Sequence, residues 1–538
     1  MRIGLAHINI TPADISGNLK KAIEVYQQAS KLGCDIVVYP ELTIPGYIPF
    51  DILNYSWFVE KNLTALNKFA STTSKTAAII GYVDKNTQGW GKPLKNAAAF
   101  IQNGRIVKKV YKKIIPFSDI FYESRYFEPD NNPPEIINFK GKKILITVCA
   151  DIWHNTDILS TPRISQTSPL DSEKKYEMII NISASPYHFG KIEKKLSTLK
   201  RIATLRQADI VYVNICASTE TTVFDGTSFF ISASKLFTTN PFTDGLSVVD
   251  TQDFQNTEIK EDISFIEKAI VLGIKDFFSK SGFEKAVIGL SGGIDSAVVL
   301  CLASKAIGSK KIKSLLLPSR FTSSQSISNA IDLCHNLCCE YEIIDIEKIY
   351  SSYLKTLKID DRNPTITIQN IQSRIRSNIL MAYSNRYGSL LLNTSNKSEI
   401  ATGYSTIYGD SCGAIAPIGD VLKTDVYRIA KLINSKKTII PQSIIKRPPT
   451  AELKPNQRDQ DDLPPYSILD RIIKMYIEEK RDPEEIADIV GKKNLVFSIV
   501  KRIEAAEYKR KQMPPIIKVS RCSFGDERKI PVIKKLEI

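Results

Sequence analysis

Residues 286–300 hold the feature of this sequence that most restricts its possible folds. An apolar run from Ala286 to Leu290 predicts a buried strand, and the apolar pattern that follows Asp295 predicts a helix. Between them lies the loop Ser-Gly-Gly-Ile-Asp-Ser, residues 291–296. Two adjacent glycines let the backbone turn sharply and direct its N–H groups at an anion, and the N-terminus of the following helix attracts the same anion. The stretch therefore predicts a phosphate site at the carboxyl end of a strand.

Several residues of this loop are suited to phosphate binding. The serine hydroxyl groups are donors, and the aspartate can hold a metal ion beside phosphate. The residues predicted to bind phosphate are Ser291, Gly292, Gly293, Asp295 and Ser296. The lysine of a Walker loop is missing, and the loop instead resembles that of the ATP pyrophosphatases. This resemblance implies that the same residues bind ATP and hold its pyrophosphate during transfer of AMP. A turn that merely requires small residues is the alternative, and the serines and the aspartate argue against it.

The rest of the second half predicts the fold around this loop. A polar and acidic segment, residues 251–262, indicates a linker between a domain at 1–250 and a domain at 263–538. Strand patterns at 312–317 and 341–346 alternate with helical patterns. This alternation predicts a doubly wound parallel sheet, in which ligands bind at the carboxyl ends of the strands.

Charged residues beyond the loop are candidates for binding phosphate and metal. A helical pattern that begins near residue 369 carries two arginines, Arg374 and Arg376, and Lys423 lies in a polar segment further on. All three side chains could neutralise phosphate charge. Asp295 and Glu399 could share an Mg²⁺ ion, because this ion prefers oxygen ligands. Ion pairs at the surface are the alternative explanation for some of these residues.

The first half, residues 1–250, alternates short β-rich runs with helical patterns, which predicts a layered α/β domain. Reactive side chains fall at the ends of three strand patterns: Glu41, Lys112 or its neighbour Lys113, and Cys149. A thiolate can attack an amide carbon while a carboxylate takes up the proton, and an ammonium group can stabilise the oxyanion. Each residue alone has a structural explanation, but together they predict an amidase.

Motifs around these residues resemble a known family. Pro-Glu-Leu at 40–42, Cys-Ala-Asp-Ile-Trp at 149–153 and Phe-Asp-Gly at 224–226 occur in the order of the carbon–nitrogen hydrolase domain of glutamine-dependent NAD synthetases. The resemblance implies a nitrilase-like α-β-β-α sandwich that releases ammonia from L-glutamine. The spacing to Pro116 selects Lys112, with Lys113 as the alternative. By position, the general base, lysine and nucleophile are Glu41, Lys112 and Cys149, and the supporting residues are Glu123, Tyr47 and Ser185.

Two positions depart from the pattern of that domain. Ala150 stands where the family has a glutamate that helps to hold the amino group of glutamine. Residues 217–221 replace the family's Gly-Gly-Gln-Asp-Glu motif. These differences leave an alternative open, namely a synthetase that uses mainly free ammonia and carries a weak glutaminase domain.

The second half carries further motifs of the same family. They include Asn-Lys-Ser-Glu at 396–399, Gly-Tyr-Ser-Thr-Ile-Tyr-Gly-Asp at 403–410 and Pro-Thr-Ala-Glu-Leu at 449–453. The resemblance to glutamine-dependent NAD synthetases then covers nearly the whole chain. It implies deamido-NAD and ATP as substrates, Mg²⁺ as the metal, an adenylated intermediate and a homo-oligomer. The residues implied for deamido-NAD are Arg374, Asn393, Thr394, Lys397 and Asp410, and Lys423 is implied for the ATP phosphates.

The net charge of +15 admits an alternative of another class, a tRNA-modifying ATP pyrophosphatase with a similar phosphate loop. The basic residues are spread along the chain and no Cys-x-x-Cys pair occurs, so we expect no nucleic-acid partner. No apolar run reaches the roughly 18 residues of a membrane span, so we expect no membrane contact. Nine cysteines without regular spacing predict reduced thiols and a cytoplasmic location.

Overall fold

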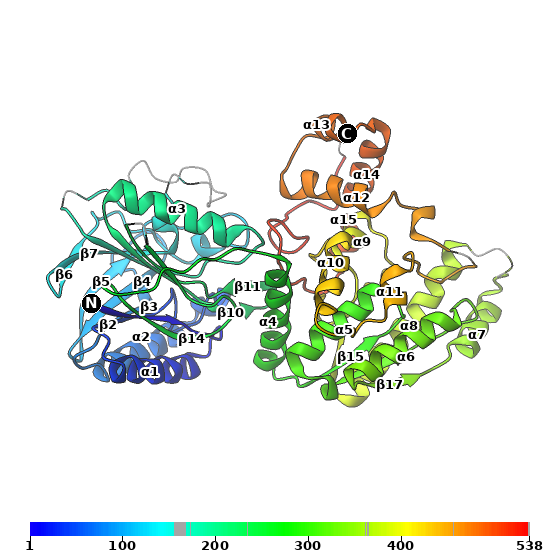
Figure 1. Ribbon diagram of the computed structural model, residues 1–538, viewed down its shortest axis with the longest axis horizontal. Coiled ribbons are helices and arrows are strands. Elements are labelled where there is room, and N and C mark those ends of the chain that lie inside the picture. Colours follow the sequence, from blue (N-terminus) through cyan, green and yellow to red (C-terminus); the bar gives the residue numbers. More distant parts are fainter. Residues whose placement is uncertain are drawn as a thin grey trace. The chain divides into compact units, whose positions relative to one another are not determined.

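The computed structural model of the chain describes residues 1–154, 156, 168–172, 174–233, 235–360, 362, 365–455 and 457–535. The chain forms two compact units, Met1–Glu261 (unit 1) and Asp262–Ile538 (unit 2), coloured blue to green and green to red in Figure 1. The segment predicted as a linker packs within unit 1 up to Glu261, whose carboxylate accepts hydrogen bonds from the Gly190 N–H (3.1 Å) and the Ile192 N–H (2.9 Å). Among the described residues, no helix is long and apolar enough to cross a membrane.

Unit 1 contains two six-stranded sheets that share one core. The first sheet has the order β14 (Gly245–Asp250), β1 (Arg2–His7), β2 (Ile36–Val38), β3 (Ala77–Lys85), β4 (Leu94–Gln102), β5 (Arg105–Tyr111). The second has the order β13 (Lys235–Thr238), β12 (Phe229–Ser232), β9 (Asp209–Asn214), β8 (Met178–Ser183), β7 (Lys142–Val148), β6 (Ile136–Phe139). Apolar side chains of both sheets, such as Val38 and Val148, belong to one buried cluster, so the sheets pack face to face.

Helices cover the outer faces of the two sheets. α1 (Ile15–Lys31) and α2 (Ser56–Ser71) pack on the first sheet, where their buried faces join the side chains that point away from the second sheet. α3 (Lys191–Arg206) contacts β9 and β12 of the second sheet. Figure 1 shows these three helices on opposite sides of the strands. The predicted α-β-β-α sandwich is confirmed. A short hairpin, β10 (Cys216–Thr219) and β11 (Thr222–Asp225), completes the strands of unit 1 that are described.

Unit 2 is built on a four-stranded parallel sheet. Its order is β17 (Glu340–Ile343), β16 (Ile312–Leu316), β15 (Lys285–Gly289), β18 (Ser389–Leu392). From β15 the chain first adds strands on one side and then returns to place β18 on the other side. The strand order therefore reverses at β15, and the phosphate loop follows this strand directly. Ligands of open parallel sheets bind at such a reversal point.

Helices lie on both faces of this sheet. α7 (Glu347–Leu357) and α8 (Ile366–Tyr387) share a buried cluster with side chains of β15, β16 and β18. On the opposite face α5 (Ile294–Ile307) packs against α4 (Ile263–Ser281) and α10 (Lys423–Ile433). α6 (Ser324–Leu337) follows β16 and contacts it. The doubly wound sheet predicted for the second half is confirmed.

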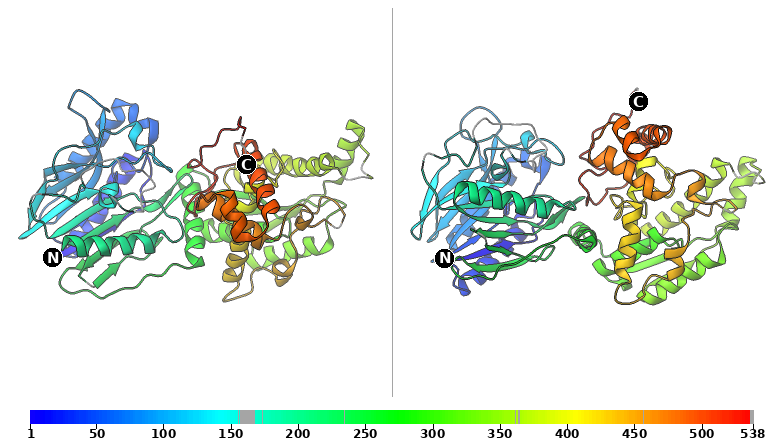
Figure 2. Two further views of the ribbon diagram at one scale, coloured as in Figure 1. Left: turned by 90° about the horizontal axis from the view of Figure 1, so that it is seen from above. Right: turned by 45° about the horizontal axis from the view of Figure 1, so that its top comes forward.

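The last part of unit 2 is helical and has a core of its own. α12 (Tyr466–Ile473), α13 (Pro483–Val490) and α14 (Lys493–Ala505) contribute to one buried cluster, with the π-helical turn Lys474–Glu478 between the first two. These helices are orange in Figures 1 and 2, and the views agree that they lie together. The shorter helices of unit 2 are α9 (Lys397–Thr402), α11 (Gln442–Lys446) and α15 (Glu507–Arg510).

Candidate active sites

The candidate nucleophile of unit 1 lies in a sharp turn at the end of β7. Cys149 begins the 3₁₀ helix Cys149–Trp153, is 4% exposed and has a φ of 44°, a conformation that side-chain-bearing residues rarely adopt. The Asp151 carboxylate holds this turn, because it accepts hydrogen bonds from the N–H groups of Val148 (3.0 Å) and Ile114 (2.8 Å). Sequence reasoning gave no role to Asp151, and its place two residues after the cysteine was the available signal.

Glu41, Lys112 and Glu123 form a fully buried charged cluster beside this turn. Lys112 Nζ lies 2.6 Å from Glu41 Oε1 and 2.7 Å from Glu123 Oε2, and all three side chains are 0% exposed. Burial lowers the pKa of Lys112, but the two carboxylates outweigh it and hold the pKa above its ordinary value. Burial raises the pKa of Glu123, against the effect of Lys112. The ammonium group therefore stays charged and fixed between two carboxylates.

One hydroxyl group and one side-chain amide orient these carboxylates. Tyr47, a predicted supporting residue, donates its hydroxyl to Glu123 Oε1 (2.9 Å). Asn96 donates its side-chain N–H to Glu41 Oε1 (2.7 Å) and to Glu123 Oε2 (3.2 Å). Sequence patterns did not lead us to Asn96. The available signal was a polar asparagine at the start of the otherwise apolar run of β4. Of the two candidate lysines, only Lys112 contacts Glu41, since Lys113 Nζ lies 3.1 Å from Asp130 Oδ2.

The loop after β8 supplies a backbone donor to the same cluster. The Ala184 N–H donates to Glu41 Oε2 at 2.9 Å, and Ser185 follows directly. Burial raises the pKa of the Cys149 thiol, Glu41 raises it further and Lys112 opposes both. The thiol is therefore protonated at rest, next to a carboxylate that can take up its proton. This arrangement can attack an amide carbon.

In unit 2 the phosphate loop has the geometry that its glycines predict. Gly292 has a φ of 77°, and a Cβ on it would lie 2.2 Å from the Ser326 carbonyl oxygen. Ser291 and Ser296 hydroxyl oxygens lie 3.1 Å apart, and the Gly293 N–H donates to Ser291 Oγ at 3.2 Å. These bonds hold the loop in a tight turn at the N-terminus of α5, where backbone and hydroxyl donors lie close together.

This loop opens on a cavity of about 310 Å³ at the carboxyl ends of β15, β16 and β18. Its walls are formed by most of the residues predicted for ATP and deamido-NAD. The predicted residues that line it are Ser291, Gly292, Gly293, Asp295, Ser296, Asn393, Thr394, Glu399, Asp410 and Lys423. Burial raises the pKa of Asp410 to about 6, and the Thr406 N–H opposes this rise.

Asp295, Glu399 and Lys423 meet on one side of the cavity. Lys423 Nζ contacts Asp295 Oδ2 and lies 3.3 Å from Glu399 Oε1. Asn396 donates to Asp295 Oδ1 at 3.0 Å and caps α9, so the two carboxylates are held by one helix start. The pKa of Glu399 is raised to about 8. Burial and the Asp295 carboxylate raise this pKa, and Lys423 partly opposes them. In the described part of the chain no group of three or more His, Cys, Asp or Glu side chains could hold a metal. Two carboxylates beside a phosphate loop nevertheless fit Mg²⁺, which commonly takes its other ligands from phosphate and water.

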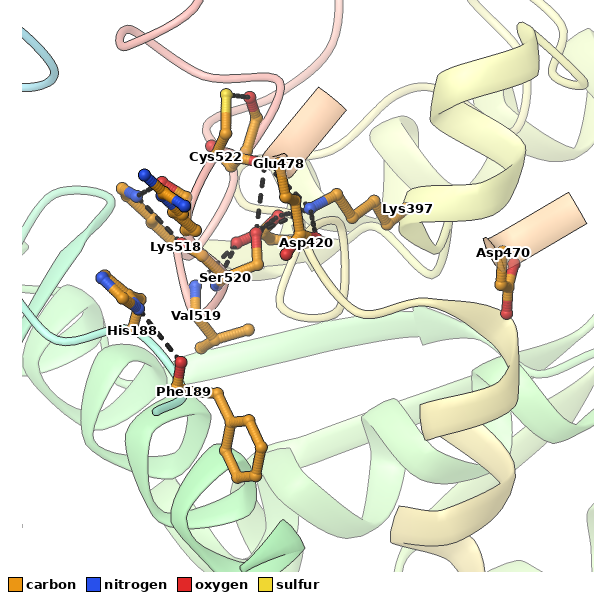
Figure 3. Close-up of polar contacts among 12 residues, drawn as sticks. His188, Phe189, Lys397, Asp420, Asp470, Glu478, Lys518, Val519, Ser520 and Cys522 are labelled. Atoms are coloured by element: carbon orange, nitrogen blue, oxygen red, sulfur yellow. Dashed lines mark hydrogen bonds and ion pairs between the residues drawn. The ribbon is translucent and has the colours of Figure 1, made fainter. Parts of the chain in front are cut away.

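Two predicted ligands of deamido-NAD, Arg374 and Lys397, do not line the cavity. Arg374 donates Nε to the Ile407 carbonyl oxygen at 3.1 Å. Lys397 is 0% exposed, and its Nζ lies 3.0 Å from Asp420 Oδ1 and 2.6 Å from Glu478 Oε1. Figure 3 shows Lys397 pointing toward these acids and Ser520. The ion pairs thus join the start of α9 to Asp420 and to the π-helical turn Lys474–Glu478, and a hydrogen bond from Lys397 Nζ to Ser520 Oγ (2.6 Å) joins it to the C-terminal segment.

Two other arginines line the cavity: Arg376, which the sequence offered as a phosphate-neutralising candidate, and Arg447, to which it gave no role. Arg376 donates Nε to the Leu317 carbonyl oxygen at 2.9 Å, and burial lowers its pKa to about 10. Arg447 contacts Ser326 Oγ and Glu452 Oε1, each at 2.5 Å. Glu452 belongs to the motif at 449–453, and this motif was the available sequence signal for the Arg447–Glu452 pair.

Two family models match this chain, one for each unit. A model described as carbon-nitrogen hydrolase matches residues 2–234. A model described as NAD synthase matches residues 266–513. The two matches occur in the order of the two candidate sites.

Relatives are similar over the full length. The glutamine-dependent NAD(+) synthetase of Thermotoga maritima is 38% identical, with 100% of this chain and 99% of the relative covered. That of Aquifex aeolicus is 35% identical, with 99% of each covered. A solved structure of the Acinetobacter baumannii glutamine-dependent NAD+ synthetase, in complex with adenosine diphosphate, has a TM-score of 0.76 at 29% identity, covering 99% of this chain and 98% of that one. The Cytophaga hutchinsonii synthetase shares the fold, with a TM-score of 0.85 at 20% identity and coverage of 99% and 98%.

Proposed function

The chain belongs to the glutamine-dependent NAD(+) synthetases, and from this premise we propose which residues perform its two reactions. Unit 1 hydrolyses the side-chain amide of L-glutamine. Unit 2 uses ATP to convert deamido-NAD to NAD with the ammonia produced. The observation that carries the proposal is the buried contact of Lys112 with Glu41 beside Cys149, together with a phosphate loop that opens on a charged cavity.

In unit 1, Cys149 Sγ attacks the amide carbon of glutamine while the thiol proton passes to Glu41. Lys112 and backbone N–H groups stabilise the negative charge that develops on the carbonyl oxygen. The carbon–nitrogen bond then breaks, and Glu41 returns the proton to the nitrogen, which leaves as ammonia. Water attacks the thioester with Glu41 as the base, which releases glutamate and restores the thiol.

In unit 2, the nicotinate carboxylate of deamido-NAD attacks the α-phosphorus of ATP, and pyrophosphate leaves. The N–H groups of residues 292–293 and the hydroxyl groups of Ser291 and Ser296 bind the departing pyrophosphate. Ammonia then attacks the activated acyl carbon, the bond to AMP breaks and one proton is released. Lys423 and Arg376 supply positive charge at the cavity wall during both steps.

The carboxylates of Asp295 and Glu399 would hold Mg²⁺ in this site. When bound, the ion neutralises phosphate charge. Asn396 and Lys423 keep the two carboxylates at the cavity in its absence. All nine cysteines are free thiols, which a reducing compartment such as the cytoplasm preserves. From the resemblance to the family we also expect a homo-oligomer. Sedimentation at several concentrations tests the oligomer.

The nitrogen source separates this proposal from the ammonia-only alternative raised by Ala150. NAD formation is measured with glutamine and with ammonium chloride for the wild type and for Cys149→Ala. We expect the wild type to use both, and the variant to use ammonium alone. Wild-type synthesis that requires ammonium, with no response to glutamine, would leave unit 1 without the proposed role.

A further inference from the structure

The Ala184 N–H is a small but central group of the amidase site. It donates to Glu41 Oε2 at 2.9 Å. Burial raises the pKa of the Cys149 thiol, and a hydrogen bond from the same N–H counters part of that rise by favouring the thiolate. Both contacts depend on the direction in which this one N–H points. The path of the backbone after β8 therefore has to be fixed precisely.

Asn214, the last residue of β9, fixes the neighbouring residue of that path. Its Oδ1 accepts the Ser185 N–H at 2.8 Å, and its Nδ2 donates to the Ser185 carbonyl oxygen at 3.0 Å. One side chain thus holds both peptide groups of Ser185. Asn214 is 0% exposed, so water does not compete for either bond.

A fully buried ion pair decides which way the Asn214 amide faces. Asn214 Nδ2 also donates to Asp225 Oδ1 at 3.3 Å. A carboxylate only accepts hydrogen bonds, so it selects the NH₂ side of the amide and leaves the carbonyl side for the Ser185 N–H. Lys195 Nζ lies 2.9 Å from Asp225 Oδ2, with both side chains 0% exposed, and neutralises a charge that would otherwise be costly to bury.

We propose that Asn214, oriented by Asp225 and Lys195, is a positioning residue for glutamine hydrolysis. The chain of contacts runs from Lys195 through Asp225 and Asn214 to Ser185, and from there to the Ala184 N–H at Glu41. None of the first three residues touches the reacting atoms. The inference rests on the function proposed for unit 1.

Asn214→Leu tests this inference, because it keeps the approximate size and removes both bonds to Ser185. A shift of this N–H by about 1 Å at the nucleophile should lower kcat for glutamine hydrolysis by about 100-fold. We expect a smaller effect on KM, and the rate of Cys149 alkylation by iodoacetamide should shift to higher pH. Ammonium-dependent NAD formation, which unit 2 performs, should be unchanged.

Asn62→Leu is the matched control. Asn62 is also 0% exposed and holds both peptide groups of one residue, with Nδ2 at 2.6 Å from the Val83 carbonyl oxygen and Oδ1 at 3.3 Å from the Val83 N–H. The leucine substitution removes the same kind of bonds at a residue that does not face Cys149. The control should keep the wild-type kcat and the wild-type alkylation profile.

A second variant serves if Asn214→Leu does not yield folded protein. Lys195→Met/Asp225→Leu leaves no buried charge and no acceptor that selects the direction of the Asn214 amide, so kcat and the alkylation profile should move in the same directions. Wild-type values of both in either folded variant would overturn the inference, as would an equal loss in Asn62→Leu. If the wild type does not hydrolyse glutamine, the function proposed for unit 1 fails, whereas the alkylation profile still judges the positioning of Cys149.

Discussion

Glu41 connects the parts of the amidase site at the scale of single residues. Its Oε1 receives Lys112 Nζ at 2.6 Å and its Oε2 receives the Ala184 N–H at 2.9 Å. Glu41→Gln keeps the size but removes the proton acceptor that we propose, so kcat for glutamine hydrolysis should fall about 100-fold or more. NAD formation from ammonium should persist. Steady-state assays of both reactions check this, and equal loss of the two would show that Glu41 acts on folding rather than on proton transfer.

Asp151 predicts a dependence of stability on pH. Burial raises its pKa from 3.8 to about 6, despite the N–H donors of Val148 and Ile114. The folded protein therefore binds this proton more tightly than the unfolded chain does. The stabilisation is fully present below the unfolded pKa and is lost as the pH rises through the folded pKa.

Asp151→Asn removes this contribution. Trp57, Trp90 and Trp153 are the three tryptophans of the sequence and all belong to unit 1, so their fluorescence reports the unfolding of that unit in urea. The free energy of unfolding of the wild type relative to the variant should decrease by up to about 3 kcal/mol as the pH rises through the range between the two pKa values. A difference that stays constant with pH would contradict the raised pKa.

The phosphate loop makes a prediction at the scale of elements. Gly292 has a φ of 77° and would place a Cβ 2.2 Å from the Ser326 carbonyl oxygen, whereas a Cβ on Gly293 would meet only Ser291 Oγ, at 3.2 Å. Gly292→Ala should lower NAD formation from either nitrogen source about 100-fold, since it displaces the N–H groups that we propose bind pyrophosphate. Gly293→Ala is the control and should lose much less. Similar losses in both variants would mean that space, rather than backbone conformation, limits the loop.

Local patterns predicted the elements of this fold well because they depend on neighbours in the sequence. The loop at 291–296 needs only its own glycines, its hydroxyl groups and the helix that follows. A helix turns by about 100° per residue, so residues two apart point in different directions. Arg374 and Arg376 therefore cannot both face the cavity, and periodicity alone does not say which one does.

Contacts between residues far apart in the sequence could not be predicted from local patterns. Lys397 belongs to a motif beside the cavity, yet its ammonium group contacts Glu478 and the hydroxyl group of Ser520. The same limit applies to Asn96, which meets Glu41 only because β4 and the end of β2 lie in one sheet. Sequence motifs predicted the residue types of both candidate sites, while the partners of each side chain required the fold.

At the scale of the whole molecule, each unit has its own buried clusters. The clusters of unit 1 contain residues of the two facing sheets and their helices, and those of unit 2 contain residues of the parallel sheet and the C-terminal helices. Two separate cores predict that each unit can fold by itself. The boundary is sharp, since Glu261 binds the start of α3 and Asp262 caps α4, where its side chain accepts the Ser264 N–H at 2.9 Å.

A fragment of residues 262–538 should therefore fold and form NAD from ammonium, but not from glutamine. A fragment that begins at residue 264 lacks the Asp262 cap and should be less stable by about 1 kcal/mol. Thermal unfolding of both fragments, with ammonium-dependent activity, measures the two effects. If the longer fragment is folded but inactive with ammonium, the cavity of unit 2 depends on unit 1. If the longer fragment does not fold, the core of unit 2 is not sufficient for independent folding, even with α4 capped by Asp262.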